Sequence, residues 1–114
     1  MKLGEYLHLN SQIKQVSKEI KASVQLNHDQ IVILHYILNT DNNKASLKEI
    51  EKYIDLSKTL TSRYVKDLID KEYLSKQWSE SDERERILHM NEKQIENTLT
   101  ALELIEEYIN EKVV

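Results

Sequence analysis

The chain has no proline and a single glycine among its 114 residues, so it lacks the residues that most often interrupt a helix. Along most of its length, apolar residues recur at intervals of three and four, which is the spacing of one helical face. The longest polar interruption, 39–44, is typical of a loop. These features predict a mainly α-helical chain with helices over 3–25, 27–39, 46–54, 57–71 and 91–114.

The composition is that of one soluble globular domain, 1–114, with 39% hydrophobic and 32% charged residues. No apolar run is long enough to span a membrane, and residues 1–11 lack the apolar segment of a signal peptide, so we expect a cytoplasmic protein. The absence of cysteine excludes disulfides, thiolate nucleophiles and cysteine-based zinc sites. The histidines are dispersed and there is no glycine-rich loop, so we expect no enzymatic activity, no metal and no cofactor.

The segment 46–72 has the spacing of a helix-turn-helix. Ser46 and Glu49 form a capping-box pattern, Asp55 and Leu56 supply a short turn, and Ser57 can cap the second helix. The apolar residues of this second helix lie on one side, while hydroxyls and cations lie on the other. Such side chains suit phosphates and base edges in a major groove, although an ordinary solvated helix face is the alternative. The candidate DNA-binding residues of this helix are Ser57, Lys58, Thr59, Ser62, Arg63 and Lys66.

A hairpin is predicted over 73–90, with strands at 73–79 and 85–90 and a polar turn at 80–84. A two-stranded hairpin is marginal alone, so it must pack on the helices, as the wing of a winged helix-turn-helix does. All three arginines lie in one stretch of 24 residues that spans this helix and hairpin: Arg63, Arg84 and Arg86. The 13 lysines, in contrast, are spread along the chain. Arginine suits phosphates, guanine edges and narrow minor grooves. The cluster therefore favours a DNA-reading surface over a chance grouping.

The first and last helices, 1–25 and 91–114, each carry an apolar stripe with a spacing of three and four. Two such stripes exceed what one small core needs, so we interpret them as the dimerisation helices of a homodimer. Packing of the two helices on each other within one monomer is the alternative. The candidate interface residues are Tyr6, Leu9, Ile13, Val16, Ile20, Leu102, Ile105 and Ile109.

The formal net charge of −4 argues against nucleic-acid binding, but the charge is unevenly distributed. Residues 91–114 have two lysines and six glutamates, while 57–90 has seven basic and seven acidic residues. A neutral reading region can bind DNA if its cations share one face. We therefore expect modest affinity with a real salt dependence.

Three short motifs lie within the stretch 26–91: Leu-Lys-Glu-Ile at 47–50, Tyr-Leu-Ser-Lys at 73–76 and Ser-Asp-Glu-Arg at 81–84. Through these motifs the stretch resembles the SarA family of staphylococcal regulators, a branch of the MarR-type winged helices. This resemblance implies that Arg84 enters a minor groove, that Asp82 orients it, and that Glu83 belongs to the same wing motif. It also implies a dimeric transcription factor on A·T-rich promoters of virulence-type genes. Where MarR-type proteins usually have glycine after the recognition helix, this chain has Glu72, which requires another turn or a left-handed non-glycine residue.

Two functional hypotheses therefore stand. The favoured one is a homodimeric winged-helix regulator that binds double-stranded DNA with helix 57–71 and wing 79–86. The alternative is an adaptor that forms heterodimers with other regulators and does not itself bind DNA. A small-molecule effector pocket lined by Trp78, Tyr64 and Tyr73 is less favoured than a core role for these aromatic residues at the base of the wing.

Overall fold

The computed structural model describes residues 1–81 and 84–112 of the chain, and these residues form two compact units. One unit comprises Met1–His28 and Thr100–Val114, and the other comprises Asp29–Leu99. Of the described helices, none is long and apolar enough to cross a membrane.

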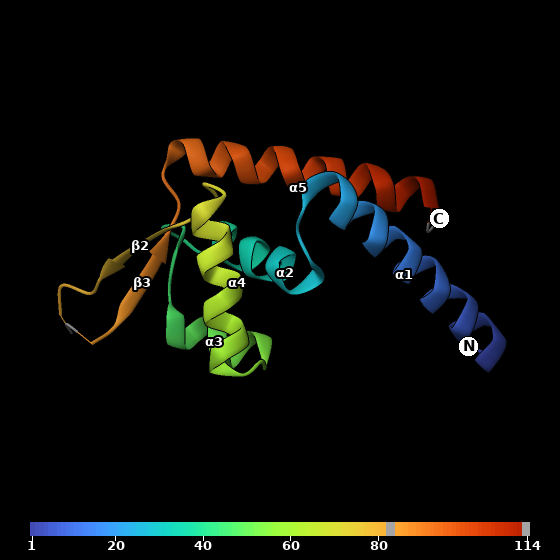
Figure 1. Ribbon diagram of the computed structural model, residues 1–114, viewed down its shortest axis with the longest axis horizontal. Helices are drawn as coiled ribbons and strands as arrows, with labels where there is room; N and C mark the ends of the chain where they lie inside the picture. The colour runs from blue at the N-terminus through green and yellow to red at the C-terminus, as the bar shows by residue number, and fades with distance from the viewer. Residues whose placement is uncertain (82–83, 113–114) are drawn as a thin grey trace. The chain divides into compact units, whose positions relative to one another are not determined.

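The Asp29–Leu99 unit contains a helix-turn-helix and a small antiparallel sheet (Figure 1). The sheet has the strand order β1-β3-β2, so β3 is its central strand. The predicted mainly α-helical winged helix-turn-helix is confirmed. Its helices are α2 (His28–Leu38), α3 (Leu47–Ile54), α4 (Lys58–Asp70) and the start of α5 (Glu92–Lys112), and its strands are β1 (Lys44–Ser46), β2 (Ser75–Trp78) and β3 (Arg86–His89).

The third strand is a correction to the sequence analysis, which predicted a two-stranded hairpin and assigned Lys44 to a loop. In the structure, β1 pairs with β3 and places Ala45 opposite Leu88. Three residues are too few to show an alternating pattern, and this strand is defined only by a partner that lies more than 40 residues later in the chain. The extra strand joins the hairpin to the start of α3 through Ser46.

The core of this unit is apolar and almost completely inaccessible to solvent. It draws on α2, α3, α4 and the sheet, which explains why so small a sheet is stable here. Its fully buried side chains include Ile33, Leu34, Ile37, Ile50, Leu68, Leu74 and Leu88.

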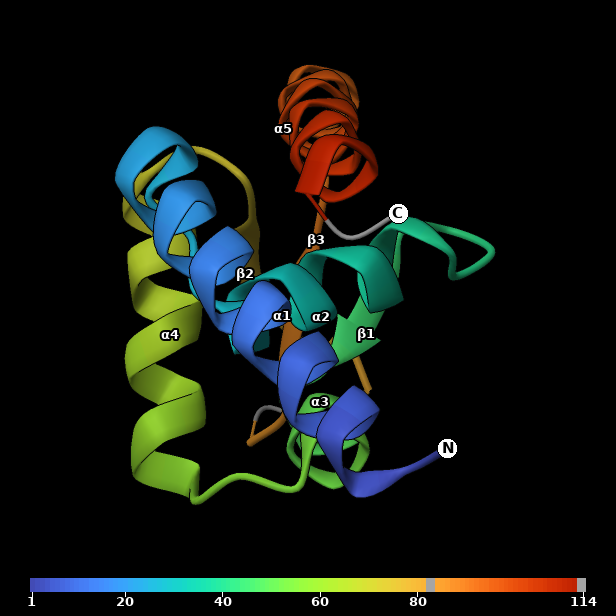
Figure 2. The same ribbon diagram turned by 90° about the vertical axis from the view of Figure 1, so that its right-hand side faces the viewer.

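The predicted helix starts of α3 and α4 are confirmed by their capping contacts. Ser46 Oγ accepts a hydrogen bond from Glu49 N at 3.1 Å, and Ser57 Oγ accepts one from Leu60 N at 3.1 Å. Between the two helices, Asp55 has a left-handed backbone with φ of 54°. Figure 2 shows the short turn that joins the end of α3 to the start of α4. These local contacts set the geometry of the helix-turn-helix.

The base of the hairpin is joined to α5 by Gln94. Asn91 and Gln94 cap α5 reciprocally, with Gln94 N donating to Asn91 Oδ1 at 2.8 Å and Asn91 N donating to Gln94 Oε1 at 2.9 Å. Gln94 Nε2 also donates to the Ser75 hydroxyl at 2.8 Å. The residue that caps α5 thereby holds the first residue of β2.

The other unit contains α1 (Leu3–Val24) and the part of α5 that follows Thr100. These helices contact each other, because the Tyr108 hydroxyl donates to Ser23 Oγ at 2.8 Å and Gln12 Nε2 donates to the Lys112 carbonyl at 3.3 Å. Val16, Ile20 and Ile105 are buried, each at most 5% exposed. Part of each terminal stripe is therefore buried within one chain.

Candidate nucleic-acid interface

Helix α4 has one buried side and one exposed polar side. Thr61, Val65 and Leu68 are buried, with at most 4% exposed. The six residues that the sequence analysis selected on this helix are all exposed and lie on the other side: Ser57, Lys58, Thr59, Ser62, Arg63 and Lys66.

A groove of about 280 Å³ lies between the exposed side of α4 and the hairpin. Ser62 and Lys66 line it from α4, and Lys76 and Arg86 line it from the strands. Leu47, Val65, Ile69 and Leu88 form its apolar floor and walls. The groove therefore brings three cations and a hydroxyl from separate segments onto one surface.

The strand register explains why Lys76 and Arg86 share this groove. Lys76 is opposite Leu88, and Trp78 is opposite Arg86, in the antiparallel β2–β3 pair. Residues two apart on a strand point to the same face, so these four side chains lie on the α4 side of the sheet. Lys76 was not selected from the sequence, because the signal for it is the pairing register, which a single strand does not reveal.

Trp78 is the second residue whose role the sequence analysis missed. It is 54% exposed, so the expected core role at the base of the wing is wrong. The guanidinium carbon of Arg86 lies 3.7 Å from the centre of the Trp78 ring. The exposed tryptophan therefore serves as a stacking surface for one of the wing arginines.

The end of the hairpin carries Arg84, which is exposed. The Ser79 amide donates to the Glu85 carbonyl at 2.9 Å and extends the β2–β3 pairing by one step. Asp82 and Glu83 lie outside the described residues, so the expected orientation of Arg84 by Asp82 stays a prediction. We refer to the exposed polar side of α4 and the hairpin cations together as the α4–wing face: Ser57, Lys58, Thr59, Ser62, Arg63, Lys66, Lys76, Arg84 and Arg86.

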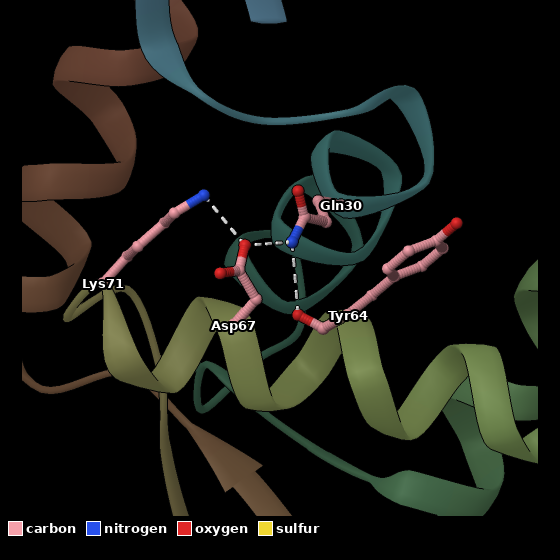
Figure 3. Close-up of polar contacts among 4 residues, drawn as sticks. All are labelled: Gln30, Tyr64, Asp67 and Lys71. Carbon is pink, nitrogen blue, oxygen red and sulfur yellow. Dashed lines mark hydrogen bonds and ion pairs between the residues drawn. The ribbon is translucent and has the colours of Figure 1, made fainter.

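A polar network fastens α4 to α2 (Figure 3). Gln30, which is buried on α2, donates through Nε2 to Asp67 Oδ2 at 2.7 Å and to the Tyr64 carbonyl at 3.4 Å. Lys71 Nζ lies 2.8 Å from the same Asp67 oxygen. The Lys71 ammonium, helped by Gln30, holds the pKa of Asp67 below its ordinary value of 3.8. The network therefore ties the orientation of α4 to the helix behind it.

A second cavity of about 400 Å³ lies on the other face of the hairpin. Lys44, Ser46 and Glu49 line it from β1 and α3, and Gln77 and Ser79 line it from the hairpin. Neither this cavity nor the α4–wing groove is lined by Trp78, Tyr64 or Tyr73. The described residues contain no cluster of three or more histidine and acidic side chains that could hold a metal ion.

The eight candidate dimer residues differ in accessibility. Val16, Ile20 and Ile105 are buried, and Leu9 and Leu102 are half-buried. Tyr6, Ile13 and Ile109 are 55%, 47% and 40% exposed. The accessible apolar surface of this unit is therefore formed by the stripe residues that are not buried within the chain. It also includes Leu3 and Leu7.

Comparison with known proteins identifies the family. The family model for the transcriptional regulator SarA/Rot matches residues 15–100. The HTH-type transcriptional regulator SarR of Staphylococcus aureus (strain USA300) is 30% identical over 107 residues, which cover 94% of this chain and 93% of SarR. The HTH-type transcriptional regulator rot of Staphylococcus aureus (strain MRSA252) is 25% identical over 97 residues, covering 85% of this chain and 57% of rot.

Solved structures with the same fold are more distant in sequence. The MarR family regulator Sco3205 from Streptomyces coelicolor, solved in complex with DNA, has a TM-score of 0.80 at 13% identity and covers 96% of this chain and 69% of its own. Wild-type MarR from E. coli, in its apo form, has a TM-score of 0.79 at 14% identity, covering 99% and 82%. The chain belongs to the SarA/Rot family of transcriptional regulators, which are not enzymes, and it has the fold of the MarR family.

Proposed function

We propose that this regulator binds double-stranded DNA in the cytoplasm as a homodimer, with α4 in the major groove and wing 79–86 in the adjacent minor groove. The observation that carries the proposal is the α4–wing groove, in which Lys66, Lys76 and Arg86 converge from two elements. Sco3205 was solved in complex with DNA, and AbfR bound to DNA has a TM-score of 0.73 to this chain at 16% identity. Both share the fold that presents this face.

The electrostatics of the proposal are local, because the formal net charge of the chain is −4. Interactions between exposed charges are screened over about 8–10 Å at physiological salt, so the cations nearest the phosphates dominate the attraction. The six cations of the α4–wing face lie on α4 and the hairpin, while all six glutamates after residue 90 lie on α5. Binding should therefore be of modest affinity and should weaken with salt.

The wing supplies the preference for A·T-rich promoters in this proposal. Narrow minor grooves of A·T-rich DNA have an enhanced negative potential that attracts arginine. Arg84 is exposed next to the end of the hairpin, as such a probe requires. The promoters of virulence-type genes are the proposed targets, by extension from the family.

The homodimer is proposed from the apolar surface of the terminal unit. Leu3, Tyr6 and Leu7 on α1 are each more than half exposed, and Ile109 on α5 is 40% exposed. Exposed apolar surface concentrated on two helices is typical of an association interface. A second copy of the chain fits it, since a two-fold dimer presents two reading heads to successive major grooves.

The proposal is tested by fluorescence anisotropy of labelled A·T-rich and G·C-rich duplexes with the wild-type protein and Arg84→Ala. We expect Arg84→Ala to weaken binding by roughly tenfold on A·T-rich DNA and to flatten the preference, since a base-reading arginine contributes about 1–3 kcal/mol. Lys93→Ala is the matched control, because Lys93 is an exposed cation on the first turn of α5. Unchanged affinity and preference in Arg84→Ala would remove the wing from the interface.

The same titrations separate the regulator from the adaptor hypothesis. Lys66→Ala should weaken binding to all sequences alike and lower the salt slope by about one for each copy of the chain. A well-folded wild-type protein that binds no duplex and forms complexes only with other regulators would favour the adaptor.

A further inference from the structure

Arg86 stacks on an exposed tryptophan, Trp78. The two residues face each other across the β2–β3 pair, and the guanidinium carbon lies 3.7 Å from the centre of the indole ring. A guanidinium stacked on an indole is stabilised by the ring quadrupole and by dispersion. Because Trp78 is 54% exposed, a role in the core does not explain why a tryptophan lies on the wing.

Stacking leaves the guanidinium able to bind an anion. A guanidinium has five N–H donors that point outward in its own plane, and a ring that lies against its face does not occupy them. Among the described residues, Arg86 makes no ion pair with a carboxylate, although Glu85 is its neighbour in the chain. Arg86 can therefore donate to an anion outside the chain.

The position of the stack indicates what that partner is. Arg86 lines the same groove as Lys66 and Lys76, and Ser62 adds a hydroxyl. Several cations and a hydroxyl in one groove match successive phosphates of a nucleic-acid backbone better than they match a single base edge. Arg84 does not line this groove.

We propose that Trp78 is a positioning residue, which holds Arg86 over the α4–wing groove so that Arg86, Lys66 and Lys76 bind the phosphates of DNA between α4 and the wing. This inference rests on the proposed function and adds a second contact to that of Arg84. Its physical basis is pre-organisation: an arginine loses up to about 2 kcal/mol of rotamer freedom when it is immobilised, and the stack restricts Arg86 before DNA arrives.

The test is a double-mutant cycle on DNA binding, with Trp78→Leu, Arg86→Ala and the double variant measured by anisotropy on one duplex. Trp78→Leu should weaken binding by about two- to fivefold per wing. This is the loss of affinity expected when an exposed cation–π contact is removed. The double variant should bind no more weakly than Arg86→Ala alone, because Trp78 acts through Arg86. Additive losses in the cycle would overturn the inference.

Conservative variants distinguish positioning from a merely structural effect. Trp78→Phe should recover part of the affinity lost in Trp78→Leu, since phenylalanine still offers an aromatic face. Arg86→Lys should fall below wild type, because an ammonium keeps the charge but loses the planar stack and the fork of donors. Gln77→Ala is the matched control, since Gln77 lies on the opposite face of β2 and should leave affinity unchanged.

Tryptophan fluorescence gives a readout that does not require DNA, because Trp78 is the only tryptophan in the chain. Arg86→Ala should shift the emission of free protein toward longer wavelength as the ring gains solvent exposure. DNA should then change the emission of wild type and leave that of Arg86→Ala nearly unchanged. Identical spectra for the free wild-type and Arg86→Ala proteins would contradict the stack.

The outcomes also separate this inference from the proposed function. If Arg84→Ala and Lys66→Ala weaken binding while Trp78→Leu and Arg86→Ala do not, the proposed function stands and the positioning role is wrong. If the wild-type protein binds no duplex, both are wrong. Thermal unfolding of each variant checks folding, and we expect little change, because Trp78 is exposed and Arg86 is only partly buried.

Discussion

At the scale of single residues, Glu72 shows how this chain ends α4 without glycine. Glu72 has a φ of 67°, in the left-handed region that favours glycine. The Tyr73 amide donates to the Leu68 carbonyl at 3.0 Å and the Glu72 amide donates to the Ile69 carbonyl at 3.1 Å, which is the Schellman arrangement. The left-handed non-glycine residue was one of two exits expected from the sequence, and it is confirmed.

Glu72→Gly should stabilise the protein. Glycine removes the left-handed strain of roughly 1–2 kcal/mol. It also raises the conformational entropy of the unfolded chain, which costs about 0.4–1 kcal/mol of stability, so we expect a net gain of up to about 1.5 kcal/mol in the free energy of unfolding. Urea denaturation measures this change. Glu72→Ala is the control, because it removes the same side chain but keeps the strain. An equal gain in both variants would trace the effect to the carboxylate.

Residue types alone indicated the candidate face on α4, but they did not indicate Trp78 or Lys76. The exposed α4 residues follow from helical periodicity, which is a local property. Whether Trp78 is buried or stacked depends on which residue of β3 lies opposite, and the register places Arg86 there. Cross-strand pairing is a tertiary property that one strand does not encode.

At the scale of elements, the placement of α4 depends on a contact that no local pattern announces. Gln30 and Asp67 are 37 residues apart in the sequence, yet Gln30 Nε2 lies 2.7 Å from Asp67 Oδ2. The helices themselves were predictable from capping and periodicity, because both act within a few residues. The short strand β1 was not, because it is defined by pairing with β3.

The polar network around Asp67 makes part of the free energy of unfolding depend on pH in the acidic range. Because the folded pKa of Asp67 is lowered, its carboxylate stabilises the fold fully above the ordinary value of 3.8, and this contribution disappears as the pH falls below 3.8 through the folded pKa. Asp67 is 43% exposed, so the effect is small. Asp67→Asn should flatten the acidic limb of the stability–pH curve, measured by chemical denaturation. A limb identical to that of wild type would show that the network contributes no pH-dependent stability.

At the scale of the whole molecule, the proposed association of two copies rests on the terminal unit. Ile13 is 47% exposed on α1, whereas Val16 and Ile20 are buried, so the accessible part of the stripe is the part available to a second copy. The apolar spacing favoured the use of these helices in a homodimer, with packing on each other within one monomer as the alternative. The two uses are distinguished by burial in the folded chain: buried side chains pack within the chain, and exposed ones are available to a second copy.

Ile13→Glu should convert a dimer to a monomer, because it places a charge in an apolar interface. Sedimentation equilibrium measures the change, and DNA affinity should fall with it. Gln15→Glu is the matched control, since it adds the same charge at an exposed position on another side of α1. A wild-type protein that sediments as a monomer, or an Ile13→Glu protein that remains a dimer, would contradict this interface.

The central claim is that the α4–wing face binds DNA through cations brought together by the fold. The most direct test compares two double variants by anisotropy on one A·T-rich duplex. The first combines Lys66→Glu with Lys76→Glu. The second combines Lys93→Glu with Lys112→Glu and therefore has the same net charge. Lys66 and Lys76 line the groove, while Lys93 and Lys112 are exposed on α5. We predict that the first pair abolishes binding and that the second leaves most of it. Equal losses in the two pairs would show that net charge, and not this face, governs binding.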